Sequence, residues 1–102
     1  MNFTGKVVLV TGAGRGIGAA IARAFAGEGA TVAVNYLRNA QAAQDVVEQC
    51  RAAGGDAFAL QADVTDAAQA TALAQGVVDE AGRIDVLVNN AFRAHAFDPE
   101  QR

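Results

Sequence analysis

An apolar run that enters a glycine-rich turn near the N-terminus constrains this chain more than any other feature. Residues 9–18 read Leu-Val-Thr-Gly-Ala-Gly-Arg-Gly-Ile-Gly. Glycine at Gly12, Gly16 and Gly18 lets the strand turn sharply, the backbone approach an anion and the following helix lie close on the strand. A helix that begins near Gly16 points its N–H groups and the positive end of its dipole at that anion. The pattern predicts a turn that binds a dinucleotide pyrophosphate, with a purely structural tight turn as the alternative.

Strand and helix patterns alternate along the chain. Continuous β-branched and leucine runs indicate parallel strands buried on both faces, and apolar residues at helical spacing indicate the helices between them. The predicted strands are Val7–Val10, Thr31–Tyr36, Asp56–Ala62 and Asp85–Asn89; the predicted helices run from Ile17 to a stop at Gly27 and Gly29, from a cap at Asn39 to Gly54 and Gly55, and from a cap at Thr65 or Asp66 to Gly82.

This order predicts an α/β fold, the N-terminal half of a Rossmann-type doubly wound parallel sheet with about four strands alternating with three helices. Residues 1–91 are expected to form the N-terminal part of a dinucleotide-binding domain. Residues 92–102 lose the periodicity and contain the only proline, Pro99. They are expected to form an irregular loop that leads to a missing C-terminal half.

Composition excludes several classes of function. Hydrophobic residues make up 52% of the 102 residues, but no apolar run approaches the roughly 20 residues of a membrane span. The N-terminus enters a strand at once and leaves no room for a signal peptide, so a cytoplasmic location is expected. A net charge of −3 argues against nucleic acid as a partner. Cys50 is the only cysteine, so we expect neither an internal disulfide nor a metal site, and a packing role for its side chain.

Four stretches of the sequence resemble the short-chain dehydrogenase/reductase family. Thr11 to Gly18 matches the family's T-G-x-x-x-G-x-G, and Asp63-Val64 resembles the pair that contacts adenine. Asp85 opens the predicted fourth strand, and Asn89-Asn90-Ala91 resembles the N-N-A-G that ends it. Within the family the sequence is most similar to the 3-oxoacyl-acyl-carrier-protein reductases. The family's last glycine is replaced by Phe92, either a wall of the nicotinamide pocket or an anchor for the following loop.

The resemblance implies a role for individual residues around a nicotinamide dinucleotide. Two alternatives stay open: Asp63 as a turn residue before a helix, and Asn89 and Asn90 as partners of backbone groups at a strand end. The implied contacts are Gly12, Arg15, Gly16, Ile17 and Gly18 with the pyrophosphate and adenosine ribose, Asp63 and Val64 with adenine, and Asn90 and Ala91 with the nicotinamide ribose.

The end of the second strand bears on the choice of cofactor. An acidic residue there would bind the ribose 2'-hydroxyl of NAD, but the chain reads Asn-Tyr36-Leu-Arg38 instead. Arg15 in the glycine turn and Arg38 can both donate charge-assisted hydrogen bonds to a 2'-phosphate. The sequence therefore favours NADP(H) over NAD(H), with Tyr36 and Arg38 added to the candidate site. The alternative is that both arginines are ordinary surface charges.

Catalytic groups of the resembled family are not found in this sequence. The family uses a serine and a Tyr-x-x-x-Lys pair, whereas the only tyrosine is Tyr36 and the only lysine is Lys6. The only histidine, His95, is a weak candidate for a general acid. The resemblance then implies that the catalytic residues lie on a missing or separate C-terminal fragment, which would pair with the exposed edge of the fourth strand, beside the first.

Three interpretations remain. The leading one is the cofactor-binding N-terminal portion of an NADP(H)-dependent short-chain reductase, a homo-oligomer when complete, inactive as this fragment alone. Its substrate would be a small carbonyl or alcohol compound or an acyl thioester. The alternatives are a non-catalytic truncated dinucleotide-binding module and an inert degradation product.

Overall fold

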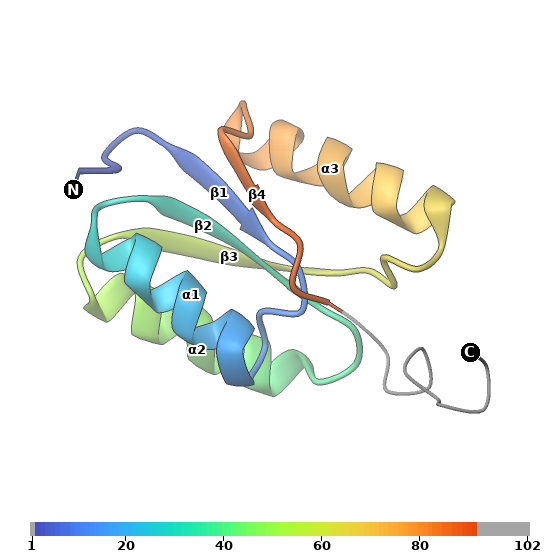
Figure 1. Ribbon diagram of the computed structural model, residues 1–102, viewed down its shortest axis with the longest axis horizontal. Helices are drawn as coiled ribbons and strands as arrows, with labels where there is room; N and C mark the ends of the chain where they lie inside the picture. Colours follow the sequence, from blue (N-terminus) through green and yellow to red (C-terminus); the bar gives the residue numbers. More distant parts are fainter. Residues whose placement is uncertain (1, 92–102) are drawn as a thin grey trace, which may run out of the picture.

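Strands and helices alternate strictly in the computed structural model, which describes residues 2–91 (Figure 1). The predicted alternation and the Rossmann-like α/β class are confirmed. The strands are β1 (Val7–Val10), β2 (Thr31–Tyr36), β3 (Asp56–Gln61) and β4 (Val86–Val88), and the helices are α1 (Gly16–Gly27), α2 (Ala40–Ala52) and α3 (Ala67–Ala81). Pro99, His95, Phe92 and the expected loop at 92–102 lie outside the described residues.

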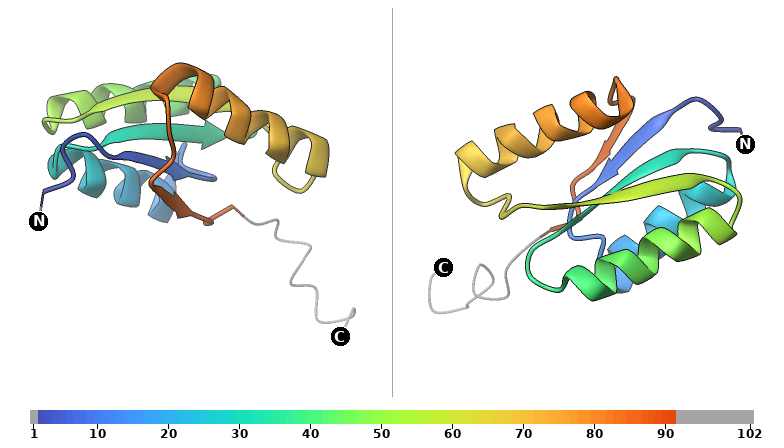
Figure 2. Two further views of the ribbon diagram at one scale, coloured as in Figure 1. Left: turned by 90° about the horizontal axis from the view of Figure 1, so that it is seen from above. Right: turned by 180° about the vertical axis from the view of Figure 1, so that it is seen from behind.

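The four strands form one parallel sheet in the order β3-β2-β1-β4. This places β4 beside β1, as expected from the sequence. Helices α1 and α2 lie along one side of the sheet and α3 along the other (Figures 1 and 2). The fold is therefore three-layered, with a hydrophobic cluster on each face of the sheet.

Alternate residues of β1 supply the two clusters. Val8 and Val10 pack with α1 and α2, while Val7 and Leu9 pack with the residues of α3. All four side chains are buried, which explains why this strand reads as a continuous apolar run. Cys50 is 0% exposed within the α1–α2 cluster, and this confirms its predicted packing role.

The helices begin and end near the predicted residues, and the structure decides between the two predicted caps of α3, Thr65 and Asp66. Asn39 caps α2 by accepting a hydrogen bond from the Ala42 N–H at 2.9 Å. Asp66, not Thr65, caps α3, because its carboxylate accepts from Ala68 N–H at 2.9 Å while Thr65 is bonded to Asp63. Gly82 ends α3 in the left-handed conformation at φ +87°.

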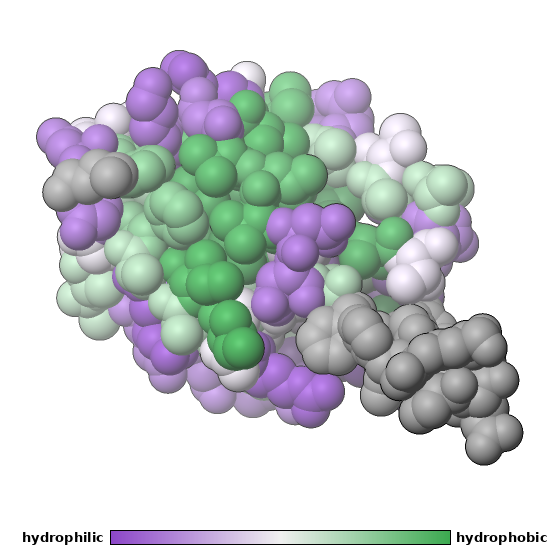
Figure 3. Space-filling view, viewed as in Figure 1, coloured by the Kyte–Doolittle hydropathy of each residue, from purple (hydrophilic) through white to green (hydrophobic). Residues whose placement is uncertain are grey.

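Strand β4 is shorter than predicted and lies at the edge of the sheet. It spans three residues where five were expected, because it can pair only with Val8 to Val10 before β1 turns away. Within residues 2–91 no strand pairs with its other edge. Leu87 is 61% exposed there. Apolar side chains gather in the middle of the face seen in Figure 3, over β1 and β4.

No helix among residues 2–91 is both long and apolar enough to cross a membrane.

Candidate dinucleotide-binding site

The carboxyl ends of all four strands lie at one edge of the sheet (Figure 1). In an open parallel sheet this edge is where ligands bind, at the point where the strand order reverses. Here the reversal lies between β1, which leads into the glycine turn, and β4. The predicted site residues follow these strand ends: residues 12–18 after β1, 36–38 at the end of β2, 63–64 after β3 and 90–91 after β4.

Glycine is required at three positions of the turn for two different reasons. Gly12 and Gly16 both have φ +61°, in the left-handed region that side chains rarely adopt. A Cβ at Gly18 would collide with the Gly12 carbonyl oxygen and lie 2.6 Å from the Asn90 amide nitrogen. A Cβ at Gly16 would meet nothing within 4 Å. The turn is thus closed on its inner side by Gly18 and open at Gly16.

Helix α1 begins at the open side of this turn. Its N-cap is Arg15, whose side chain makes no capping hydrogen bond, and its first turn has no acidic residue. Arg15, Gly16 and Ile17 are exposed, and Ile17 is 74% exposed. A helix N-terminus of this kind combines unpaired N–H groups with a positive dipole end, which suits a phosphate.

Thr11 fastens the end of β4 to the turn and was not singled out as a site residue from the sequence. Its hydroxyl oxygen accepts hydrogen bonds from the N–H groups of Asn90 at 2.9 Å and Ala91 at 3.0 Å. The same hydroxyl donates to Asn89 Oδ1 at 3.3 Å. The threonine of the T-G-x-x-x-G-x-G motif marked this position in the sequence. Its hydrogen-bond partners, however, follow from the pairing of β1 with β4.

Asn90 has a structural partner in the turn. Its Nδ2 donates to the Gly12 carbonyl oxygen at 3.2 Å. The predicted residues Gly12, Asn90 and Ala91 are therefore brought together, and a Cβ at Gly12 would lie 3.0 Å from the Ala91 Cα. The alternative considered for Asn90, a partner for backbone groups at the strand end, describes this hydrogen bond.

Asp63 also has local partners. Its Oδ1 accepts from the Thr65 N–H at 3.0 Å and from the Thr65 hydroxyl at 2.6 Å. The carboxylate thus shapes the turn that leads into α3, in agreement with the alternative reading of this residue. Val64 is half-buried and packs against the cluster under α3.

The residues considered for cofactor choice lie in the turn, at the end of β2 and just after it. Tyr36 is half-buried, and its Cβ is 3.4 Å from where a Cβ at Gly14 would be. Arg15 and Arg38 are exposed, and within residues 2–91 neither guanidinium forms an ion pair. Both charges are therefore open to an anionic ligand.

A buried asparagine was missed by sequence reasoning. Asn35 is 2% exposed, and its Oδ1 accepts a hydrogen bond from the Gly12 N–H at 3.1 Å. Its only signal in the sequence is an amide side chain inside the otherwise apolar stretch of β2.

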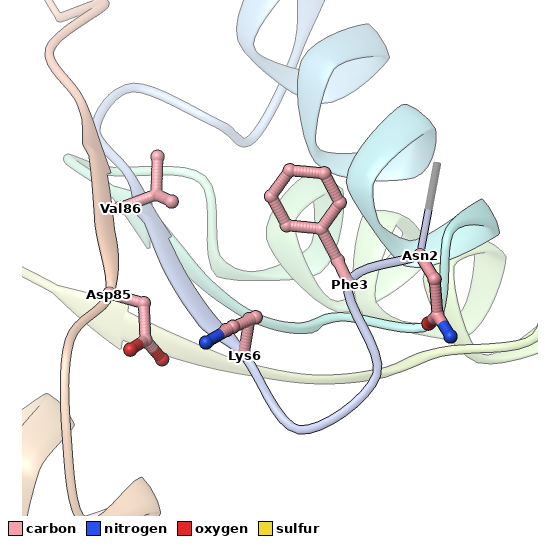
Figure 4. A pocket seen from close by; sticks show the side chains of 5 residues that line it. All are labelled: Asn2, Phe3, Lys6, Asp85 and Val86. Atoms are coloured by element: carbon pink, nitrogen blue, oxygen red, sulfur yellow. The ribbon is translucent and has the colours of Figure 1, made fainter.

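A separate surface hollow lies at the opposite end of the sheet, before β1 and β4 begin. It has a volume of about 350 Å³ and is lined by Asn2, Phe3, Lys6, Asp85 and Val86 (Figure 4). Asp85 Oδ2 accepts from the Val7 N–H at 2.8 Å, and its carboxylate pairs with Arg83 at 2.6 Å. The hydrogen bond from Val7, followed by that from Arg83, lowers the pKa of Asp85. This end of the sheet fastens β4 to β1.

Residues 6–100 match the family model for short chain dehydrogenase. The chain belongs to the short-chain dehydrogenase family. An uncharacterized oxidoreductase of Methylorubrum extorquens is 56% identical over 88% of the chain and 36% of its own length. The 3-oxoacyl-acyl-carrier-protein reductase of Staphylococcus aureus is 52% identical over 84% of the chain and 35% of its own length. The chain thus spans about a third of these relatives.

A shorter relative and two solved structures extend the comparison. The short-chain dehydrogenase/reductase homolog YusS of Bacillus subtilis is 47% identical over 89% of the chain and 84% of its own length. The crystal structure of a hydroxysteroid dehydrogenase from Escherichia coli has a TM-score of 0.84, with 43% identity over 90% of this chain and 39% of that one. An NADH-dependent reductase crystallised with NAD has a TM-score of 0.84, with 36% identity over 89% of this chain and 38% of that one.

Proposed function

We propose that this chain is the cofactor-binding N-terminal part of an NADP(H)-dependent short-chain oxidoreductase. Hydride would pass between C4 of the nicotinamide and a carbonyl or alcohol carbon. The observation that carries the proposal is the glycine turn, open at Gly16 and tied by Thr11 to the segment that contains Asn90 and Ala91. That arrangement leaves room for a phosphate at the start of α1, with the end of β4 beside it.

Each proposed contact belongs to one portion of the cofactor. The helix N-terminus and its glycines suit the pyrophosphate, since they offer N–H groups without a Cβ in the way. The segments after β3 and β4 suit adenine and the nicotinamide ribose. The residues proposed are Gly12, Arg15, Gly16, Ile17 and Gly18 for the pyrophosphate and adenosine ribose, Tyr36 and Arg38 for the 2'-phosphate end, Asp63 and Val64 for adenine, and Asn90 and Ala91 for the nicotinamide ribose.

The preference for NADP(H) rests on charge at the end of β2. No carboxylate stands at Tyr36, Leu37 or Arg38, and both Arg15 in the turn and Arg38 after β2 are exposed. Two guanidinium groups would attract the 2'-phosphate of NADP(H), which a carboxylate would repel. We expect NADPH to bind more tightly than NADH, and Arg38→Gln to narrow that difference when both dissociation constants are measured by fluorescence titration.

Catalysis would need groups that these residues do not supply. We propose that the serine and Tyr-x-x-x-Lys of the family lie on a complementary C-terminal part that covers the open edge of β4. The exposed Leu87 supports such a contact. The complete protein would be a cytoplasmic homo-oligomer that reduces or oxidises a small carbonyl or alcohol compound, an acyl thioester among them by likeness to the 3-oxoacyl-acyl-carrier-protein reductases.

A second candidate is a non-catalytic dinucleotide-binding module. It is favoured by the match to YusS, of whose length the aligned part makes up 84%. Intact mass under denaturing conditions, combined with titration of the native protein with NADPH, separates the two candidates. A second polypeptide accompanying the 10.4 kDa chain and carrying the catalytic motif supports the oxidoreductase, whereas a 10.4 kDa species that binds NADPH alone supports the module.

The binding site itself is tested by a matched pair of glycine variants. Gly16 and Gly5 both have positive φ, and a Cβ at either would meet nothing within 4 Å. Gly16→Val and Gly5→Val should therefore have similar strain, of about 1–3 kcal/mol. Only the first would place a side chain where the phosphate binds, so its NADPH affinity should fall at least about tenfold, or about 1.4 kcal/mol. Equal affinities for the two variants would refute the site.

A further inference from the structure

Asn35 is a buried amide near the carboxyl end of the inner strand β2. Its side chain belongs to β2, whose preceding residues Val32, Ala33 and Val34 are all 0% exposed. Thr11 and Asn35 are the buried polar residues of the part described, residues 2–91. An amide at such a place is costly unless each polar atom has a partner. The partners that Asn35 has therefore indicate what the residue does.

Those partners lie on the glycine turn and at the end of β3. Oδ1 accepts from the Gly12 N–H at 3.1 Å, on the glycine turn. Nδ2 donates to the carbonyl oxygens of Leu60 at 3.2 Å and Ala62 at 3.3 Å, at the end of β3. The Asn35 backbone carbonyl accepts a further hydrogen bond from the Ala13 N–H at 2.7 Å.

Only one orientation of this amide fits its surroundings. A flipped side chain would set Nδ2 against the Gly12 N–H and Oδ1 against two carbonyl oxygens, so donors would face donors and acceptors would face acceptors. The site therefore demands one acceptor on the β1 side and a donor on the β3 side. Among side chains of this size, asparagine meets both demands without a charge.

We propose that Asn35 is a positioning residue for the dinucleotide, fixing the glycine turn relative to the segment after β3. This rests on the proposed function, which assigns the pyrophosphate to the turn and adenine to Asp63 and Val64. One ligand must reach both places, so their separation affects its affinity. Asn35 holds that separation from inside the sheet and touches neither the cofactor nor the substrate.

The hydrogen bonds also divide the turn into two halves. Gly12 and Ala13 give their N–H groups to the side chain and the backbone of Asn35. These two groups therefore point into the sheet and not toward a phosphate. Backbone N–H contacts to a phosphate therefore fall to the later part of the turn, from Gly16 onward, where α1 begins. Gly12 would approach the cofactor through its other backbone atoms, and Arg15 through its side chain.

Asn35→Asp is the informative variant because it has the same shape but titrates. As a carboxylate it can accept from Gly12 but repels the carbonyls of Leu60 and Ala62, whereas the protonated acid can donate to one of them. Burial and the two carbonyl oxygens that face it raise the pKa of such a carboxyl, even though the Gly12 N–H still donates to it. We expect its affinity for NADP⁺ to be about tenfold below that of the unaltered protein at pH 8, equivalent to about 1.4 kcal/mol, and to recover toward pH 6.

Asn2→Asp is the matched control. Asn2 lies at the other end of the sheet, and its Oδ1 accepts from the Thr4 N–H at 2.8 Å, which a carboxylate can also do. This variant introduces the same charge, and its ratio of affinities at pH 6 and pH 8 should equal that of the unaltered protein. If Asn35→Asp keeps that ratio, whether its affinity is unchanged or is lowered equally at both pH values, the positioning role is refuted.

Two further measurements keep the inference testable. Asn35→Ser is uncharged at every pH, and it should fold, bind NADP⁺ more weakly and speed amide hydrogen exchange at Gly12. Unchanged affinity and unchanged Gly12 exchange would overturn the proposal, even if Asn35→Asp does not fold at pH 8. Hydrogen exchange needs no cofactor. If the unaltered protein binds no NADP⁺, the proposed function fails. Slow amide exchange at Gly12 that becomes faster in Asn35→Ser would still support the hydrogen bond from Gly12 to Asn35.

Discussion

Two glycines of α1 differ sharply in the space around them. A Cβ at Gly18 would strike the Gly12 carbonyl oxygen and the Asn90 amide, whereas a Cβ at Gly27 would meet nothing within 4 Å. Gly18→Ala should lower the free energy of unfolding by about 1–3 kcal/mol, because the turn would have to move. Gly27→Ala, which has no positive φ to lose, should leave it unchanged or raise it by up to about 1 kcal/mol. Urea unfolding of both variants measures the difference, and similar losses would contradict the close packing at Gly18.

Cys50 provides a second prediction for a single residue. The side chain is 0% exposed, and burial raises the pKa of its thiol, with a smaller opposing effect from Arg23. Reaction with a thiol reagent requires both access and the thiolate. The native protein should therefore react slowly with a disulfide reagent at pH 7, and the urea-unfolded protein rapidly. Fast stoichiometric labelling without denaturant would show that α2 does not cover Cys50.

At the level of elements, the local patterns predicted the strands and helices better than the contacts between them. Thr31–Tyr36 agrees with β2 at both ends, and Asn39 caps α2 as predicted. The third strand ends at Gln61 and not at Ala62, although the Ala62 N–H still donates to the Tyr36 carbonyl. The shorter β4 depends on where its neighbour β1 turns, which no pattern within residues 85–89 encodes.

Within the candidate site, too, some residues could be identified from the local sequence and others could not. Gly12, Gly16 and Gly18 could be identified because backbone conformation and close packing restrict these positions to glycine. The roles of Thr11 and Asn35 could not, because each has partners far away in the sequence. Thr11 bonds the segment after β4, as far as Ala91, 80 residues away, and Asn35 bonds the end of β3, as far as Ala62, 27 residues away. Their positions follow from strand order and register, which only the assembled sheet defines.

The connection between β1 and β4 predicts a dependence of stability on pH. The Val7 N–H and Arg83 lower the pKa of Asp85 in the folded protein. A carboxyl with a depressed folded pKa stabilises the protein above its unfolded pKa of about 3.9, and that contribution is lost as pH falls through the folded pKa. Asp85→Asn keeps an acceptor for Val7 but cannot titrate, so its melting temperature should fall less steeply in acid. Parallel curves for the two proteins below pH 5 would rule out this contribution.

For the molecule as a whole, the limit of the hydrophobic core lies between two leucines of adjacent strands. Leu9 and Leu87 are paired in register across β1 and β4, so their side chains share one face of the sheet. Leu9 is 4% exposed and packs with the cluster under α3, but Leu87 is 61% exposed. The described residues therefore cover β1 on this face and leave β4 open.

The different exposure of Leu9 and Leu87 predicts different losses of stability when each is replaced by alanine. Leu9→Ala removes a buried side chain and should cost about 2–5 kcal/mol of unfolding free energy. Leu87→Ala removes an exposed one and should change that energy by no more than about 0.5 kcal/mol in this chain. Leu87→Lys places a charge at the open edge and should reduce concentration-dependent self-association in sedimentation velocity, because charged side chains block edge contacts. If Leu87→Ala lowers the free energy of unfolding as much as Leu9→Ala does, some part of the chain or a second copy already covers β4. The open edge proposed to receive a complementary C-terminal part would then not exist.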